Sequence, residues 1–173
     1  KRHIQNFKQG KKFSKIRQEK ILPNLVSSYS THLIKRGPGI DITLQKGKAT
    51  NIQIASKNLN NIIIHPGEEF SFWSLVGNTT KKKGYQEGRV IINGKVEPDI
   101  GGGLCNLANL LHLLIVHSPM KITEFHSHSD ALDPDKGTRK PFANGTSVQY
   151  NHQDYRFKNN TDQLIQLRTW VEN

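Results

Sequence analysis

One segment constrains the fold of this chain more than any other. Between Gly101-Gly102-Gly103 and Ser118-Pro119, the residues from Leu104 to His117 are mostly apolar, and leucines recur at helical spacing. The apolar residues cover one wide face and extend nearly all round. A helix of that kind is buried by other elements, and its apolar runs are too short to cross a bilayer. The sequence therefore predicts one buried central helix over about residues 103–117.

The other predicted elements are short and mostly extended. Thr50 begins a capping box with Gln53, which predicts a helix over residues 51–59. Asn93-Gly94 indicates a tight hairpin between 89–93 and 95–97. Alternating or β-branched stretches predict strands at 41–45, 62–64, 69–73, 121–126, 147–151, 154–158 and 164–171. This order predicts an α+β fold, with a mostly antiparallel sheet packed around the central helix.

Charge divides the chain into two parts. The 173 residues carry a formal net charge of +11. Residues 1–36 hold ten of the 25 Lys and Arg residues and one of the 14 acidic residues. Gly37-Pro38-Gly39 is a strong breaker, so we predict a basic N-terminal arm over 1–36 and an α+β domain over 37–173. Such an arm attracts an anionic polymer or an anionic membrane surface, or it is simply a solvated segment.

Other partners and the location are less constrained by the sequence. The arm has no pattern of stacking aromatics and no nucleic-acid-binding motif, which argues against nucleic acid as a partner. No secretory signal or membrane-spanning segment can be recognised in the chain. The sequence leaves cytoplasmic and cell-wall-associated locations open, indicates no cofactor and predicts no oligomeric state.

The single cysteine, Cys105, lies in the predicted first turn of the central helix, just after the three glycines. A helix start offers unpaired N–H groups and a partial positive charge, which favour thiolate over thiol. We expect the backbone at Gly102 and Gly103 to let a substrate carbonyl approach, with the N–H groups of Cys105 and Asn106 facing the oxyanion. The alternative is that the glycines form only a tight turn and Cys105 is a small buried apolar residue.

A nucleophilic thiol needs a base, and two histidines follow the predicted strand 121–126. His126 and His128 are two residues apart, so they share one face if the strand continues. Either could accept the proton of Cys105. We place Asp154 as the acid that orients the imidazole, with Asp130 and Asp133 as rivals.

The same residue types allow a metal interpretation. Cys105, His126 and His128 could form a three-ligand zinc site with one open position, which would make the chain a zinc hydrolase. No HExxH or paired-cysteine element supports this interpretation. We therefore predict no metal site.

Several of these residues also belong to motifs of a known family. The chain resembles the VanW family from about residue 41 to its end, and its segment 141–163 is especially similar to VanW proteins found beside glycopeptide-resistance genes. The resemblance is carried by His65-Pro66-Gly67-Glu68-Glu69-Phe70-Ser71-Phe72, Gly84-Tyr85 with Gly88, Ile100-Gly101-Gly102-Gly103-Leu104-Cys105, His128-Ser129, and Asp154 with Phe157-Lys158-Asn159-Asn160-Thr161.

This resemblance implies a link to peptidoglycan metabolism. Some VanW-domain proteins are regarded as cysteine L,D-transpeptidases, which join stem peptides through a thioester. Carried over, the family's cysteine is Cys105 and its histidine is His128 rather than His126. Members usually have Gln directly after the cysteine and Ser soon after it, whereas this chain has Asn106 and Ala108.

Two main functions follow from the sequence. The first is a cysteine acyltransferase acting on stem peptides, with Cys105, His128 or His126, and Asp154 as catalytic residues. The second is a non-catalytic module that binds peptidoglycan or glycopeptide, with aromatic residues lining its groove: Phe70, Phe72, Trp73 and Tyr85. For Phe70 and Phe72, alternation favours packing in the core instead. A raised thiol pKa at Cys105 would favour binding over chemistry.

Overall fold

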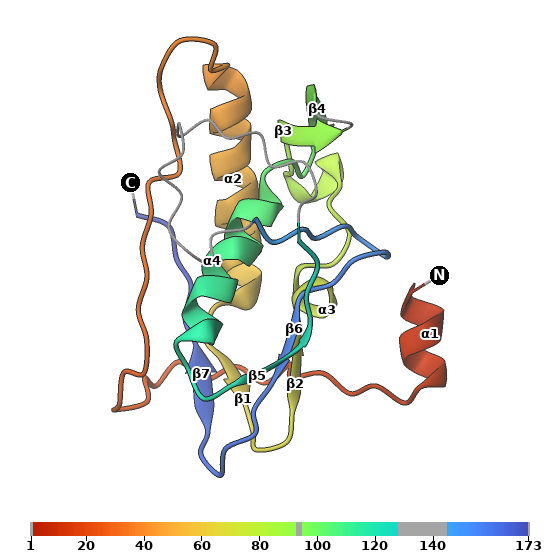
Figure 1. Ribbon diagram of the computed structural model, residues 1–173, viewed down its shortest axis with the longest axis vertical. Helices are drawn as coiled ribbons and strands as arrows, with labels where there is room; N and C mark the ends of the chain where they lie inside the picture. The colour runs from red at the N-terminus through yellow and green to blue at the C-terminus, as the bar shows by residue number, and fades with distance from the viewer. Residues whose placement is uncertain (1, 93–94, 128–144, 173) are drawn as a thin grey trace.

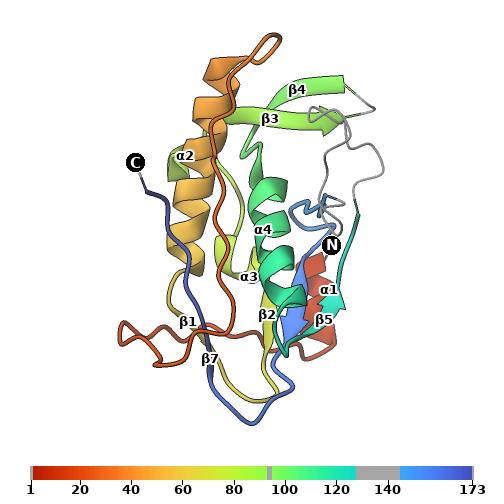
Figure 2. The same ribbon diagram turned by 60° about the vertical axis from the view of Figure 1, so that its left-hand side comes forward.

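The computed structural model describes residues 2–92, 95–127 and 145–172 and has the predicted α+β fold. Helices α2 (Ile42–Leu59) and α4 (Leu104–Val116) pack side by side, with short antiparallel strands around them (Figures 1 and 2). None of the helices in the described ranges is both long and apolar enough to cross a membrane.

Helix α4 confirms the predicted central helix but is less completely covered than its composition indicates. Its fully buried residues lie on one face, while Val116 at its end is 38% exposed. The buried residues are Leu104, Leu107, Ala108, Leu111 and Ile115. The core therefore lies along that face of α4, against α2 and the strands.

Helix α2 is longer than predicted. It begins at Ile42, so the strand predicted at 41–45 is wrong and the helix predicted at 51–59 is only its second half. Asp41 caps the helix, because its Oδ1 accepts hydrogen bonds from Thr43 N at 2.8 Å and Leu44 N at 3.3 Å. Gly47 lies against β3 (Glu87–Ile92), where a Cβ atom would come within 1.8 Å of the Glu87 carbonyl oxygen.

The described strands form three small antiparallel sheets rather than one. The first pairs β1 (Ile62–Ile64) with β7 (Ile165–Leu167). The second has the order β2 (Glu69–Ser71), β6 (Arg156–Lys158), β5 (Lys121–Glu124). The third is the predicted hairpin of β3 with β4 (Lys95–Ile100).

Some predicted strands are shorter or missing. Residues 72–76 form the short helix α3 (Phe72–Val76) instead of continuing β2, because the Ser71 side chain caps that helix. Residues 147–151 form a turn with an isolated bridge, Gln149 to Gln153. Lys81–Lys83 forms a single exposed turn of 3-10 helix, η1.

The basic arm is attached to the rest of the molecule. It begins with α1 (Arg2–Lys8) and then runs along the ends of β2 and β1 (Figure 1). Ser14 N donates to Glu69 O at 2.9 Å, Ile63 N donates to Ile16 O at 2.8 Å and Gln18 N donates to Asn61 O at 3.0 Å. The arm thus links two of the sheets, while the predicted boundary at residues 36 and 37 stays a prediction.

Candidate functional site

Cys105 lies in the first turn of α4, as the sequence predicts. Gly103 is the N-cap with φ of +96°, and the thiol faces the extended backbone at Val148. The sulfur is 3.6 Å from the Val148 carbonyl oxygen, to which it donates, and it accepts from Val148 N at 3.5 Å. Both backbone groups of Val148 are therefore directed at this sulfur.

The electrostatic expectation for Cys105 is wrong. Burial raises the pKa of the Cys105 thiol above its ordinary value, and it outweighs the hydrogen bond from the Val148 backbone, which lowers it. The helix start therefore does not hold the sulfur as a thiolate. The contacts of the sulfur with the carbonyl and N–H groups of Val148 are those of a thiol bonded to the backbone.

The glycines before Cys105 are required by packing. A Cβ atom on Gly102 would come within 2.2 Å of the Gly88 carbonyl oxygen in β3, and one on Gly103 within 2.1 Å of the Lys48 side chain. The Gly102 carbonyl also accepts from Asn51 Nδ2 at 2.9 Å. These contacts explain the glycines without a ligand, and their role in substrate binding stays a prediction.

Asn106, the predicted binding residue next to Cys105 in the sequence, has a side-chain oxygen without a hydrogen-bond partner among the described residues. This oxygen, Oδ1, is buried. A buried acceptor of this kind costs free energy unless a donor reaches it. Asn106 could therefore accept a hydrogen bond from a ligand.

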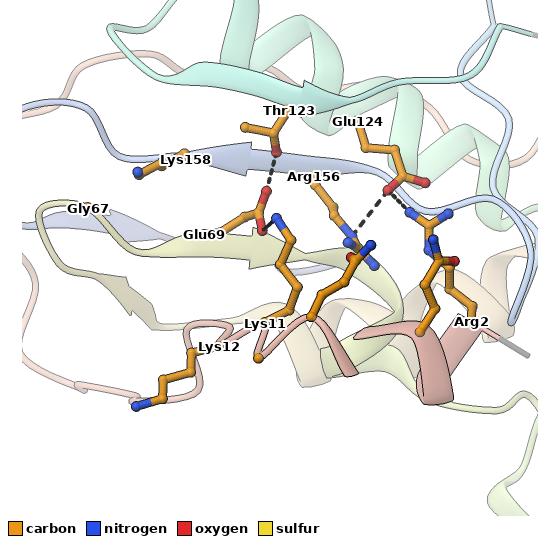
Figure 3. A pocket seen from close by; sticks show the side chains of 12 residues that line it. Arg2, Lys11, Lys12, Gly67, Glu69, Thr123, Glu124, Arg156 and Lys158 are labelled. Atoms are coloured by element: carbon orange, nitrogen blue, oxygen red, sulfur yellow. Dashed lines mark hydrogen bonds and ion pairs between the residues drawn. The ribbon is translucent and has the colours of Figure 1, made fainter. Parts of the chain in front are cut away.

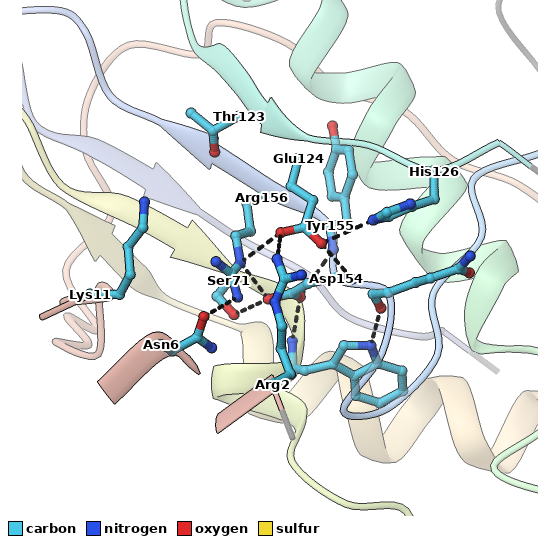
Figure 4. A network of polar contacts seen from close by, with 12 residues as sticks. Arg2, Asn6, Lys11, Ser71, Thr123, Glu124, His126, Asp154, Tyr155 and Arg156 are labelled. Carbon is cyan, nitrogen blue, oxygen red and sulfur yellow. Dashed lines mark hydrogen bonds and ion pairs between the residues drawn. The ribbon is translucent and has the colours of Figure 1, made fainter. Parts of the chain in front are cut away.

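His126 and Asp154 belong to a polar network around Glu124, shown in Figure 4. Glu124 Oε1 lies 3.0 Å from His126 Nε2 and accepts from Asp154 N at 3.1 Å. Its Oε2 pairs with Arg2 and lies 3.3 Å from Arg156 Nε. We call these five residues the Glu124 cluster.

The carboxylate of Asp154 is fully used by structural contacts. Its Oδ2 accepts from Ser71 Oγ at 2.6 Å and from Arg156 Nε at 2.7 Å, and its Oδ1 accepts from Trp73 N at 3.1 Å and Tyr155 N at 3.0 Å. The residue is 3% exposed. Asp154 therefore holds Ser71, Arg156 and two backbone N–H groups in place. No imidazole of the described residues contacts this carboxylate, and its role in orienting His128 stays a prediction.

The Glu124 cluster and Cys105 lie on different sides of the segment that follows β5. Phe125 stacks on His112 of α4 with ring centroids 4.5 Å apart, so Phe125 faces that helix. Because side chains alternate along an extended chain, Glu124 and His126 face away from it. The structure thus brings His126 and Asp154 together through Glu124, but it does not bring them to Cys105.

The remaining catalytic candidates, His128, Asp130 and Asp133, lie outside the described residues.

Within the described ranges no three His, Cys, Asp or Glu side chains form a group that could hold a metal ion. The zinc interpretation therefore has no assembled ligand set in that part of the chain.

The predicted groove of aromatic residues is a packed core. Phe70, Phe72 and Tyr85 are at most 2% exposed, and Phe70 stacks on Phe157 at 4.3 Å between ring centroids. Packing, the alternative for Phe70 and Phe72, explains these positions. Trp73 differs, because it is 7% exposed and lines a cavity while its Nε1 donates to Gln153 O at 2.8 Å.

Two adjoining cavities lie between the arm and the body. The first, of about 530 Å³, is bounded by arm residues 9–12 and the sheet β2–β6–β5 (Figure 3). In it Glu69 accepts from Thr123 Oγ1 at 2.6 Å and from Lys11 Nζ at 3.3 Å. The second, of about 410 Å³, lies beside Trp73 and is also lined by Lys11, Phe13, Lys15 and Asp154. Arg2 of the Glu124 cluster borders both cavities.

Sequence reasoning missed Glu124 and Arg156, which organise this region. The one signal for Arg156 was a charged residue between the apolar residues Tyr155 and Phe157. It is 4% exposed, and its guanidinium lies 4.7 Å from the ring centroid of Phe13 in the arm. A buried cation in a strand needs acidic partners from elsewhere in the chain.

The comparisons with known proteins agree on one family for this chain. The model of the family described as "VanW like protein" matches residues 47–173. The chain is 33% identical over 153 residues to "Vancomycin B-type resistance protein VanW" of Enterococcus faecalis. The matched region covers 88% of this chain and 55% of that protein. It is 26% identical over 164 residues to "Uncharacterized protein YoaR" of Bacillus subtilis, covering 92% of this chain and 52% of that protein. The chain thus spans about half the length of these relatives, and no solved structure gives a significant match.

Proposed function

This chain belongs to the VanW-like family, which is associated with vancomycin resistance, and from that premise we propose that it is a binding module for the peptide part of peptidoglycan. One observation carries the proposal. The sulfur of Cys105 is partly buried and bonded to the backbone of Val148, while His126 is engaged by Glu124 on the other side of the chain. Among the described residues no base contacts the sulfur, and this arrangement favours ligand binding over formation of a thioester.

The cavity beside Trp73 supports the choice of a peptide ligand. Its volume of about 410 Å³ is in the range of small-ligand sites, and the rings of Phe7, Phe13 and Trp73 line it. Lys11 and Lys15 add positive charge, and Lys15 forms no ion pair with any described residue. Aromatic rings beside cations suit a short peptide that ends in a free carboxylate, as wall stem peptides do.

A second candidate function is acyl transfer through Cys105. It is favoured by the position of the thiol in the first turn of α4, with Val148 N directed at the sulfur and the unpaired Oδ1 of Asn106 nearby. In that reaction the sulfur attacks an amide carbonyl of the stem peptide, its proton passes to a base, and the terminal amino acid leaves as the amine. An acceptor amine then attacks the thioester and releases the thiol.

Calorimetry with a synthetic stem tetrapeptide tests the binding proposal. We expect the full chain to bind the peptide with a free carboxylate more tightly than its C-terminal amide. Lys15→Ala should weaken binding about threefold to fivefold, because it removes the solvent-exposed charge pair that Lys15 would form with the carboxylate of the peptide. Lys46→Ala, an exposed lysine of α2 outside the cavity, is the matched control.

Intact-mass measurement separates the two functions. After incubation with the tetrapeptide we expect no covalent adduct, and Cys105→Ala should bind the peptide like the parent protein. An added mass equal to the peptide less its terminal amino acid, absent in Cys105→Ala, would instead establish acyl transfer. Equal affinity for the acid and the amide would contradict the proposed carboxylate site.

A further inference from the structure

Helix α1 is attached to the protein by its polar side. Arg2 pairs with Glu124 of the Glu124 cluster, and Asn6 Oδ1 accepts from Arg156 Nη2 at 3.0 Å. Residues four apart lie on the same helix face, so this face points toward the body. Figure 4 shows Arg2 and Asn6 reaching from α1 toward Arg156 and Glu124.

The opposite face of α1 is apolar and exposed. Ile4 is 63% exposed and Phe7 is 86% exposed, and the two lie three residues apart on one side of the helix. A surface helix of a globular protein normally buries its apolar face against the core. In α1 the arrangement is reversed, because the polar face is docked while Ile4 is in water. Phe7 borders the mouth of the cavity beside Trp73, but it too is mostly in water.

Positive charge surrounds this apolar face. Lys8 is in the last turn of α1, and Lys11 and Lys12 follow directly. Lys8 and Lys12 form no ion pair with a described residue, whereas Lys11 reaches Glu69. The arm as a whole carries ten basic residues and one acidic residue, so its charge is complementary to an anionic surface.

We propose that the outer face of α1, formed by Ile4, Phe7 and Lys8 with the neighbouring Lys12, docks on an anionic lipid bilayer. Ile4 and Phe7 enter the interface between head groups and acyl chains, and the lysines contact the anionic head groups. A soluble anionic polymer needs only the charges. The two large apolar side chains beside those charges are what favour a bilayer as the partner.

Vesicle sedimentation with the full chain tests this proposal. Two vesicle types are compared, one of phosphatidylcholine alone and one in which about a third of the lipid is phosphatidylglycerol. We expect binding to the anionic vesicles only. Ile4→Ser/Phe7→Ser should reduce it about tenfold or more by removing the inserted side chains, and Lys8→Glu/Lys12→Glu should reduce it about tenfold or more by removing the head-group contacts.

Matched controls make the result specific to this face. Lys46→Glu/Lys82→Glu makes the same charge change at exposed lysines of α2 and η1, and it should bind the anionic vesicles nearly as the parent does. Thermal melts should be unchanged in Ile4→Ser/Phe7→Ser, since both side chains are exposed. Unchanged vesicle binding by Ile4→Ser/Phe7→Ser would overturn the proposal. Equal losses in Lys8→Glu/Lys12→Glu and in Lys46→Glu/Lys82→Glu would also overturn it. Either result would mean that a cationic protein adsorbs to anions without using this face.

Discussion

At the scale of single residues, Cys105 shows two electrostatic effects in competition. A helix start stabilises an anion by about 0.3–1 kcal/mol where it is exposed to solvent. Burial can raise the pKa of an acidic group by up to about 3–5 units, and each unit is about 1.4 kcal/mol. The position of Cys105 at the start of α4 is visible in the sequence. Its surroundings depend on Val148, 43 residues away, and are not visible there.

The raised pKa of Cys105 predicts how stability changes with pH. The folded state holds the thiol proton more tightly than the unfolded state does. The contribution of this proton to the free energy of unfolding is fully present below the ordinary thiol pKa. It is lost as the pH rises through the raised pKa that the thiol has in the folded protein. We expect the free energy of unfolding, measured with urea, to fall by up to about 1.4 kcal/mol per pH unit above the ordinary thiol pKa.

Cys105→Ser isolates this effect. Burial also raises the pKa of Tyr85 and Tyr155, so the parent protein has further losses at higher pH. Both proteins share those losses, and only their difference reports on the thiol. The same pH dependence in the parent and in Cys105→Ser would show that the thiol titrates alike in the folded and unfolded states.

At the scale of elements, Asp154 joins parts of the fold that are far apart in the sequence. It leads into β6, bonds to Ser71 at the end of β2, and accepts from the backbone of α3 through Trp73 N. Such a carboxylate supports the packing of three elements. These contacts give Asp154 a structural role, and its role in orienting the imidazole of His128 stays a prediction, since His128 lies outside the described residues.

Asp154→Asn should consequently destabilise the fold. Breaking a buried ion pair costs about 3–5 kcal/mol, and we expect the lower end because Glu124 remains 3.3 Å from Arg156 Nε. Denaturant unfolding measures the loss. The exposed Asp162→Asn is the control and should cost under about 0.5 kcal/mol. A stable Asp154→Asn protein would favour a functional role for this carboxylate instead.

The elements that the sequence predicted well are those whose pattern is local. Helix α4 and the β3–β4 hairpin follow from leucine spacing and from the turn residues between the strands. Residues 41–45 alternate like a strand, but the Asp41 cap makes them the start of α2. Glu124 and Arg156 gain their importance from ion pairs across the sheet, and no spacing along the chain encodes such pairs.

At the scale of the whole molecule, the arm holds together parts that are otherwise separate. The described strands form three sheets, and arm residues 13–18 pair with both β1 and β2. Helix α1 is held at a different place, by Arg2 and Asn6 on the Glu124 cluster. The two attachments use different forces, since the first consists of backbone hydrogen bonds and the second of charged side chains.

Hydrogen exchange should resolve these two attachments. We expect the amides of Ser14 and Gln18 to exchange as slowly as those of β1, because each is bonded to a strand end. Arg2→Ala/Asn6→Ala should speed exchange at Gln9 and Lys11, whose amides close α1, and leave Ser14 unchanged. Lys12→Ala, an exposed neighbour, should alter neither group. If the double variant also speeds exchange at Ser14 and Gln18, the arm opens as one unit and the two attachments are not independent.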